Sequence, residues 1–410
     1  MRFFSALNSV LDLQINQLQL GSSVDAKPAR FNALFLAVCI FSICAIGYAN
    51  DSNAAINSDQ TVHLMADQNE AAWRIFNIET VENYVIPSYK NLANANSNLY
   101  LATQAFCKIL KSSSIVQLQE NLTITKKAFN RSMDAWQLIQ NVHFGPIEIG
   151  IRHHSIQFWP DKKNHIGKQL NRLITAKNEA SLTVDGFEKN SVSVKGLPAV
   201  ERLLFNDAPL EMFKEKPFTC EVLQGISRYL SDTATSLHDE WVTTMLPQFK
   251  DAKQLDGYFE DDIDATTALL KTLVEPIEVI RDLKIDRPLG SKFEKVKFKR
   301  LESWRSQRSL TNLQLNLQSL EDFFIGTDSE RKGLQSLLTR NETAEIQNNF
   351  KLVKNEIAKI KVPLEEAIQT DAGYRTAKNI SIALTQLHKS LEDAIGHSGI
   401  RLGFNSRDGD

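Results

Sequence analysis

Apolar residues recur every three or four positions along most of the chain, which is the spacing that places them on one face of an α-helix. The longest run in the first half reaches from Leu118 to His143 and ends before Gly145 and Pro146. The other runs cover residues 64–87, 163–177, 226–245, 263–280, 310–324, 346–364 and 380–395. The first half contains no alternation long enough to predict a β-strand. The pattern therefore predicts an all-α protein.

The predicted helices are long and joined by short turns, so they bury their apolar faces best as up-and-down bundles. Residues 206–217 (NDAPLEMFKEKP) contain two prolines and mixed charge without periodicity, which is typical of a boundary between domains. We therefore expect two up-and-down helical bundles of about four helices each. The first would be built from residues 50–205 and the second from residues 218–410.

Composition and charge agree with a globular helical protein. The chain has 410 residues, of which 42% are hydrophobic, so it can bury a sizeable core. Its formal net charge is −2, which gives no reason to expect a nucleic-acid partner.

The N-terminal segment resembles a secretory signal. Residues 33–49 carry no charge, Lys27 and Arg30 precede them, and Gly47 and Ala49 are small residues at the positions before a cleavage site. We expect residues 1–49 to be a signal peptide with a long segment ahead of its apolar run, cleaved after Ala49, and the protein to be periplasmic or exported. The alternative is an uncleaved membrane anchor, for which this run is at the lower edge of length.

Cleavage would leave two cysteines, Cys107 and Cys220, because Cys39 and Cys44 lie inside the apolar run. Two remaining cysteines in an exported protein predict a disulfide between them.

A short segment, residues 195–205, combines turn and helix signals. Pro198 suits the first turn of a helix, where a missing N–H removes no hydrogen bond. We place Glu201 in that first turn, where the helix dipole favours a carboxylate. Leu204 and Phe205 are apolar, so we expect Glu201 to lie beside a core.

This segment resembles the Gly-x-His-x-x-Glu signature of the imelysin family, with Gly196 and Glu201 in place and Pro198 at the position of the histidine. Further matches occur in the same order along the chain, at residues 143–147 (HFGPI), 158–161 (FWPD), 303–306 (SWRS) and 403–410 (GFNSRDGD). The resemblance implies an exported, all-helical, two-bundle bacterial protein tied to iron uptake. It also implies a ligand cleft where the bundles meet, for which we select Trp136, His143, Gly196, Glu201, Trp304, Arg305 and Arg308.

A metal site would need ligands beyond the signature, because Pro198 leaves Glu201 as its single ligand. A transition metal requires three or four ligands. His143 is the best compensating ligand, because its spacing from Trp136 predicts that it faces inward. The alternative is a capping or core histidine that is hydrogen-bonded to the backbone. The sequence does not identify a cofactor, and the candidates are iron or another divalent cation.

Arg305 and Arg308 are three residues apart and share a helix face. A guanidinium suits a carboxylate, so we expect one of them either to pair with Glu201 across the domain interface or to bind an anionic ligand.

We favour a non-enzymatic binding protein for iron or an iron-containing ligand. One alternative is a metal-dependent peptidase, since the family is filed as peptidase family M75, but the chain has no His-Glu-x-x-His and no Gly-x-Ser-x-Gly motif. The other alternative is an interaction module that docks on an outer-membrane or periplasmic protein.

Overall fold

The computed structural model describes residues 70–253, 257–326 and 332–403. The predicted signal peptide, residues 1–49, and the tail 404–410 lie outside these residues. Within them every regular element is helical and no strand occurs, so the prediction of an all-α fold is confirmed. None of the helices in this part of the chain combines the length and the apolar character needed to span a membrane.

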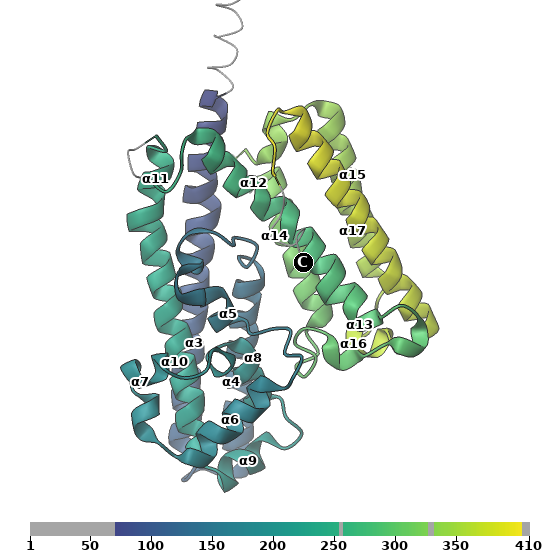
Figure 1. The fold of residues 1–410 in the computed structure, drawn as a ribbon. Helices are drawn as coiled ribbons and strands as arrows, with labels where there is room; N and C mark the ends of the chain where they lie inside the picture. The colour runs from purple at the N-terminus through teal and green to yellow at the C-terminus, as the bar shows by residue number, and fades with distance from the viewer. Residues whose placement is uncertain (1–69, 254–256, 327–331, 404–410) are drawn as a thin grey trace, which may run out of the picture. The chain divides into compact units, whose positions relative to one another are not determined.

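Three long helices form the first group, and they lie side by side in Figure 1. They are α3 (Ile86–Ile109), α4 (Ile115–Gln137) and α10 (Phe218–Glu240), and α3 packs against both of the others. Residues 70–80 are helical and lead through a π-helical turn, Val81–Val85, into α3. A disulfide joins Cys107 on α3 to Cys220 on α10, with 5.6 Å between their Cα atoms. The covalent link therefore lies at the most extensive helix pairing of this group.

Helix α10 departs from the expected division of the chain. It begins directly after residues 206–217, where we placed the domain boundary, yet it packs along α3 and also contacts α8. Its buried side chains include Leu223, Ile226 and Leu230. The apolar stripe of α10 is therefore covered by the first group of helices, although the sequence assigned residues from 218 on to the second bundle.

The second group contains α12 (Asp262–Glu278), α14 (Ser309–Ile325), α15 (Arg340–Ala358) and α17 (Asp371–His397). Helix α15 packs against α17, and α14 contacts α12 and α15 (Figure 1). Pro276 lies inside α12, and a π-helical segment, η7 (Val279–Asp286), follows it. A proline removes a backbone hydrogen bond within a helix, which accounts for an irregularity close to Pro276.

Short helices lie between the long ones along the chain. They are α5 (Arg152–Ile156), α6 (His165–Ala176), α7 (Val184–Glu188), α8 (Leu197–Leu204), α9 (Pro209–Glu215), α11 (Leu246–Lys250), α13 (Arg287–Leu289) and α16 (Leu364–Ala367). Helix α8 packs against α4 and α10.

Helix α4 ends earlier than the apolar spacing predicts. Its last residue is Gln137, and residues 138–141 form turns, whereas we expected a helix up to His143. The Gln137 carbonyl accepts a hydrogen bond from Asn316 Nδ2 at 2.8 Å, and the Leu138 carbonyl accepts one from Ser319 Oγ at 2.8 Å. Side chains of α14 thus satisfy carbonyls that are left without partners at a helix end.

Candidate ligand cleft

The start of α8 is held against another part of the backbone. Gly196 is its N-cap residue, and a Cβ atom added there would lie 2.3 Å from the carbonyl oxygen of Ile156 and 2.6 Å from that of Ser155. Real Cβ atoms do not approach backbone that closely, so only glycine fits this position. Gly196 therefore fixes the direction in which α8 leaves residues 155–156.

Glu201 is only 4% exposed and lies in the second turn of α8, because the helix begins at Leu197. The prediction that Glu201 sits in the first turn is therefore wrong, and the helix N-terminus does not support its charge. The partner of its carboxylate is Ser306, which donates hydrogen bonds to Oε1 from its backbone N–H at 2.9 Å and its hydroxyl at 2.8 Å. Burial raises the pKa of Glu201, while the two bonds from Ser306 and the charge of Arg305 oppose part of that rise.

Ser306 belongs to a loop, residues 301–308, that has an unusual backbone. Ser303 and Gln307 both have φ of 55°, a left-handed conformation that residues other than glycine adopt rarely. Between them the loop presents Trp304, Arg305 and Ser306. Such strain persists only where the surroundings hold the chain in place.

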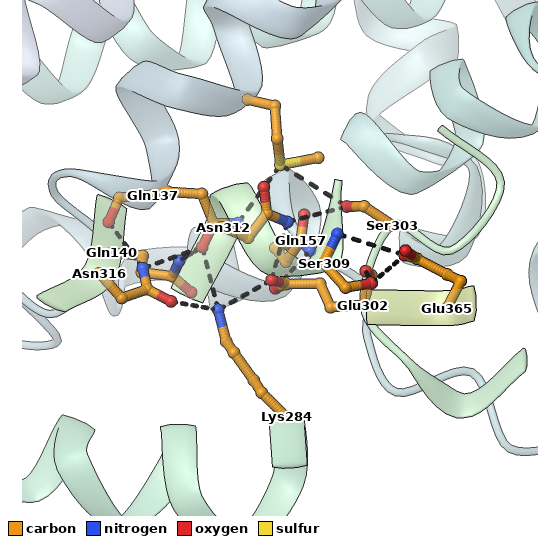
Figure 2. A network of polar contacts seen from close by, with 11 residues as sticks. Gln137, Gln140, Gln157, Lys284, Glu302, Ser303, Ser309, Asn312, Asn316 and Glu365 are labelled. Carbon is orange, nitrogen blue, oxygen red and sulfur yellow. Dashed lines mark hydrogen bonds and ion pairs between the residues drawn. The ribbon is translucent and has the colours of Figure 1, made fainter. Parts of the chain in front are cut away.

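A buried polar network holds this loop, and Figure 2 shows it. Glu302 in the loop and Lys284 in η7 form an ion pair with 2.9 Å between Nζ and Oε2, and their side chains are 2% and 4% exposed. Glu302 also accepts hydrogen bonds from Asn312 Nδ2 and Gln157 Nε2, each at 3.0 Å. The loop is therefore tied at Glu302 to residues from three other parts of the chain.

Lys284 uses all three of its N–H donors inside this network. Besides Glu302, it donates to Gln137 Oε1 at 3.0 Å and to Asn316 Oδ1 at 2.7 Å. Burial lowers the pKa of Lys284, and the adjacent Glu302 opposes that change. These contacts connect the end of α4, helix α14 and the loop through one ammonium group (Figure 2).

The network continues from the loop to α16. Ser309 hydrogen-bonds to the Glu365 carboxylate through its hydroxyl and, at 3.3 Å, through its backbone N–H. Burial raises the pKa of Glu365, and the bonds from Ser309 oppose the rise. Both ends of the loop are thus anchored by buried carboxylates.

The loop forms one wall of a cavity of about 700 Å³. Pro198, Glu201 and Arg202 of α8 line another wall. Three aromatic side chains contribute apolar surface, and they are Trp159, Phe298 and Trp304. This volume and this mixture of aromatic and charged groups are typical of small-molecule sites. We call this cavity, defined by α8, Arg287 of α13, residues 157–166 and residues 296–305, the cleft.

Basic side chains outnumber acidic ones in the cleft. The basic ones are Lys162, Arg202, Arg287, Lys297, Lys299, Arg300 and Arg305, and the acidic ones are Asp161 and Glu201. The Arg305 guanidinium lies 4.2 Å from the centre of the Trp304 ring, and Lys299 Nζ lies 5.6 Å from it. A neighbouring cavity of about 640 Å³ is also lined by Arg202, Phe298, Trp304 and Arg305.

Comparison with known proteins gives this architecture a family. The imelysin family model matches residues 85–391, which is most of the chain. The chain belongs to the imelysin family. No curated protein matches it.

Solved structures share the imelysin fold with this chain. An imelysin-like protein from Psychrobacter arcticum 273-4 is 18% identical, with a TM-score of 0.63 over 82% of this chain and 98% of that one. A structure described as an iron-regulated protein A precursor, from Parabacteroides distasonis ATCC 8503, is 17% identical, with a TM-score of 0.66 over 80% of this chain and 95% of that one. At these identities the likeness concerns the fold.

The structure brings together only some of the residues that the imelysin signature indicated. Glu201, Trp304 and Arg305 line the cleft, and Gly196 begins the helix that carries Glu201. Trp136 is fully buried in the core of α4 and does not line the cleft. Arg308, at the start of α14, pairs with Asp134 on α4.

His143 is exposed, so the prediction that it faces inward is wrong. Because α4 ends at Gln137, the helical spacing from Trp136 does not extend to it, and its ring lies 4.2 Å from that of His153. Among the described residues no group of three or more His, Cys, Asp or Glu side chains is placed to hold a metal ion. The pairing of Glu201 with His143 around a cation thus has no support in this arrangement.

The expected ion pair of Glu201 with Arg305 or Arg308 also needs correction. Ser306 provides the hydrogen bonds, Arg305 contributes through its charge, and Arg308 is engaged by Asp134. Sequence reasoning missed Ser306, although it lies within the matched SWRS motif. It also missed the Lys284–Glu302 pair and the basic run between residues 292 and 300, which was visible as a cluster of lysines and Arg300.

Proposed function

We propose that this imelysin-family protein is an exported binding protein that serves iron acquisition and holds its ligand in the cleft. The observation that carries the proposal is the cavity of about 700 Å³ at the family signature, with Glu201 on one wall and Trp304 and Arg305 on another. A strained loop that is fixed by a buried network keeps Trp304 and Arg305 in place, as a binding site requires.

Two further observations support the iron-related, exported role. One structural relative is described as an iron-regulated protein precursor. The apolar run at residues 33–49, preceded by Lys27 and Arg30, has the pattern of a secretory signal. A partner in the outer membrane or periplasm that exchanges the ligand is part of the same proposal.

A binding role accounts for Glu201 better than hydrolysis does. Both hydrogen bonds to its Oε1 come from Ser306, and Pro198 occupies the position three residues before it. A glutamate acting as a general base in a metallopeptidase works beside a metal-bound water, which needs further ligands. We therefore expect no cleavage of a peptide library, and chelator-sensitive cleavage lost in Glu201→Gln would contradict this.

The test is to isolate the protein from its native compartment and to measure its iron content by elemental analysis after gel filtration. We expect iron to co-elute with wild-type protein and with Arg131→Gln, whose side chain is exposed and lies away from the cleft. Arg305→Gln should lose most of this iron. Iron-free wild-type protein from iron-replete cells, or equal iron in all three proteins, would refute the proposal.

A further inference from the structure

The cleft concentrates positive charge that the chain as a whole lacks. The protein carries 47 Lys and Arg against 49 Asp and Glu. The cleft, by contrast, is lined by seven basic and two acidic side chains. The basic groups come from α8, from α13 and from the two loops around residues 162 and 297–305, so the chain brings them together from separate segments.

The two carboxylates of the cleft direct their hydrogen bonds to groups other than these cations. Asp161 accepts hydrogen bonds from the backbone N–H groups of His165 at 2.7 Å and Ile166 at 3.0 Å, at the start of α6. Glu201 accepts its bonds from Ser306. In the part of the chain that the structure describes, none of the seven basic side chains has a carboxylate partner within ion-pair distance.

The cations of the cleft also act on one another. The pKa of Arg305 is lowered by burial and then by the charge of Arg202, while the charges of Glu201, Asp161 and Asp207 oppose part of this decrease. The pKa of Arg287 is lowered by burial and then by the charge of Arg300. Like charges that share a partly buried space destabilise each other unless an anion joins them. The geometry thus provides guanidinium groups on more than one wall and leaves part of their counter-charge to come from outside the protein.

We propose that the cleft binds a small, multiply charged oxyanion, so that iron is carried as an anionic chelate and is not ligated directly by the protein. This rests on the proposed function of the cleft. A guanidinium donates two parallel hydrogen bonds to a carboxylate or phosphate, and several such groups converge here. A cavity of about 700 Å³ accommodates a ligand of the size of a polycarboxylate and its metal complex. The Trp304 and Phe298 rings supply apolar contact beside the charged groups.

The experiment titrates the full chain with four probes: citrate, ferric citrate, pyrophosphate and uncomplexed Fe²⁺ under anaerobic conditions. Binding is followed by calorimetry at low and high salt. The test variants are Lys299→Gln and Arg300→Gln. Their side chains are exposed and make no hydrogen bond with the described residues, so folding should be unaffected. Arg305→Gln adds a half-buried position, Arg131→Gln is the matched control, and circular dichroism verifies folding.

We expect at least one oxyanion probe to bind wild-type protein, more weakly at high salt. Arg305→Gln should weaken binding about tenfold or more, because a hydrogen bond to a charged group is lost. Lys299→Gln and Arg300→Gln should each weaken it several-fold, and Arg131→Gln should not. Tighter binding of ferric citrate than of citrate identifies the chelate as the cargo, and equal or weaker binding of ferric citrate would refute transport of iron as a chelate.

Two results would overturn the inference in distinguishable ways. Binding of Fe²⁺ by wild-type protein, without binding of citrate, ferric citrate or pyrophosphate, would refute the oxyanion and leave an iron-binding role intact. Failure of folded wild-type protein to bind any of the probes would refute both.

Discussion

The hydrogen bonds of Glu201 allow the effect of its charge on stability to be measured separately from the effect of its side-chain shape. Glu201→Gln keeps an oxygen that accepts from the Ser306 N–H and hydroxyl, and it removes the ionisable group. Glu201→Ala removes the acceptor and leaves both Ser306 donors beside a buried void. Comparing the two variants isolates the contribution of the charge.

The expected magnitudes differ clearly. An unsatisfied buried donor costs about 1–3 kcal/mol and a truncated buried side chain adds to this, so Glu201→Ala should lower the free energy of unfolding by about 3–5 kcal/mol. Glu201→Gln loses the attraction of Arg305 but avoids the cost of burying a charge. We expect it to change the free energy of unfolding by less than about 1.5 kcal/mol.

The raised pKa of Glu201 fixes the direction of the pH dependence. Between the carboxyl's unfolded pKa and its higher folded pKa, the folded protein holds a proton that the unfolded chain has released. The free energy of unfolding then falls as the pH rises through this window, by at most about 1.4 kcal/mol per pH unit. The free energy of unfolding of wild type should therefore fall relative to that of Glu201→Gln as the pH rises from acidic values. The fall should stop once Glu201 is also ionised in the folded protein.

Urea unfolding of wild type and both variants, at intervals between pH 4.5 and about 8, measures these differences. The reasoning would be refuted if Glu201→Gln were as damaging as Glu201→Ala and wild type gained stability over it with rising pH. That outcome would mean that an ionised Glu201 is stabilised by Arg305, as the sequence first suggested.

Three further changes test the framework around the cleft. Gly196→Ala should lower the free energy of unfolding by about 1–3 kcal/mol or more, because the new Cβ would overlap backbone, as thermal unfolding will show. Lys284→Met and Glu302→Gln should each cost about 3–5 kcal/mol in urea unfolding, and the double variant should cost less than their sum. Replacing Cys107 and Cys220 by Ala should cost about 2–5 kcal/mol, and non-reducing mass spectrometry of native protein should show the linked peptides.

Gly196→Ala has a matched control, and each of the three changes has an outcome that would contradict it. Gly396→Ala lies in α17 with nothing within 4 Å of the added Cβ, so it should be neutral or slightly stabilising. Equal effects at the two glycines would contradict the close approach at Gly196. Strict additivity of the Lys284 and Glu302 variants would show that the ion pair is not coupled. Freely alkylated thiols in native protein would exclude the disulfide.

The helices were predictable because their apolar faces repeat over many turns. The stripes at 226–245, 310–324 and 380–395 all appear as helices whose apolar side chains are buried. Helix ends were less predictable, and α4 shows why. No residue within 118–143 indicates that the helix ends at Gln137. The carbonyl groups of Gln137 and Leu138 at that end accept hydrogen bonds from Asn316 and Ser319 of α14, which lie far away in the sequence. A contact between residues about 180 positions apart decided a local boundary.

The same limit applies to the site. The signature located α8 and the SWRS loop, because those residues are adjacent in sequence. The signature did not reveal the hydrogen bond between Glu201 and Ser306 or the ion pair between Arg308 and Asp134. The sequence analysis assumed helical spacing for residues 303–307. These residues instead form a loop in which Ser303 and Gln307 have left-handed backbone conformations. Arg305 and Arg308 therefore do not share a face, and the two arginines have separate roles.

Pro198, which departs from the family signature, can be interpreted from the charges of the cleft that it lines. Pro198 removes the histidine that, with Glu201, would offer two ligands to a metal ion. Around this position the chain has placed seven basic side chains, which would repel a bare cation. The basic side chains of the cleft and Pro198 at the position of the signature histidine are separate features of the sequence, yet both are unfavourable for direct coordination of a cation. Both agree with the anionic ligand that we propose for the cleft.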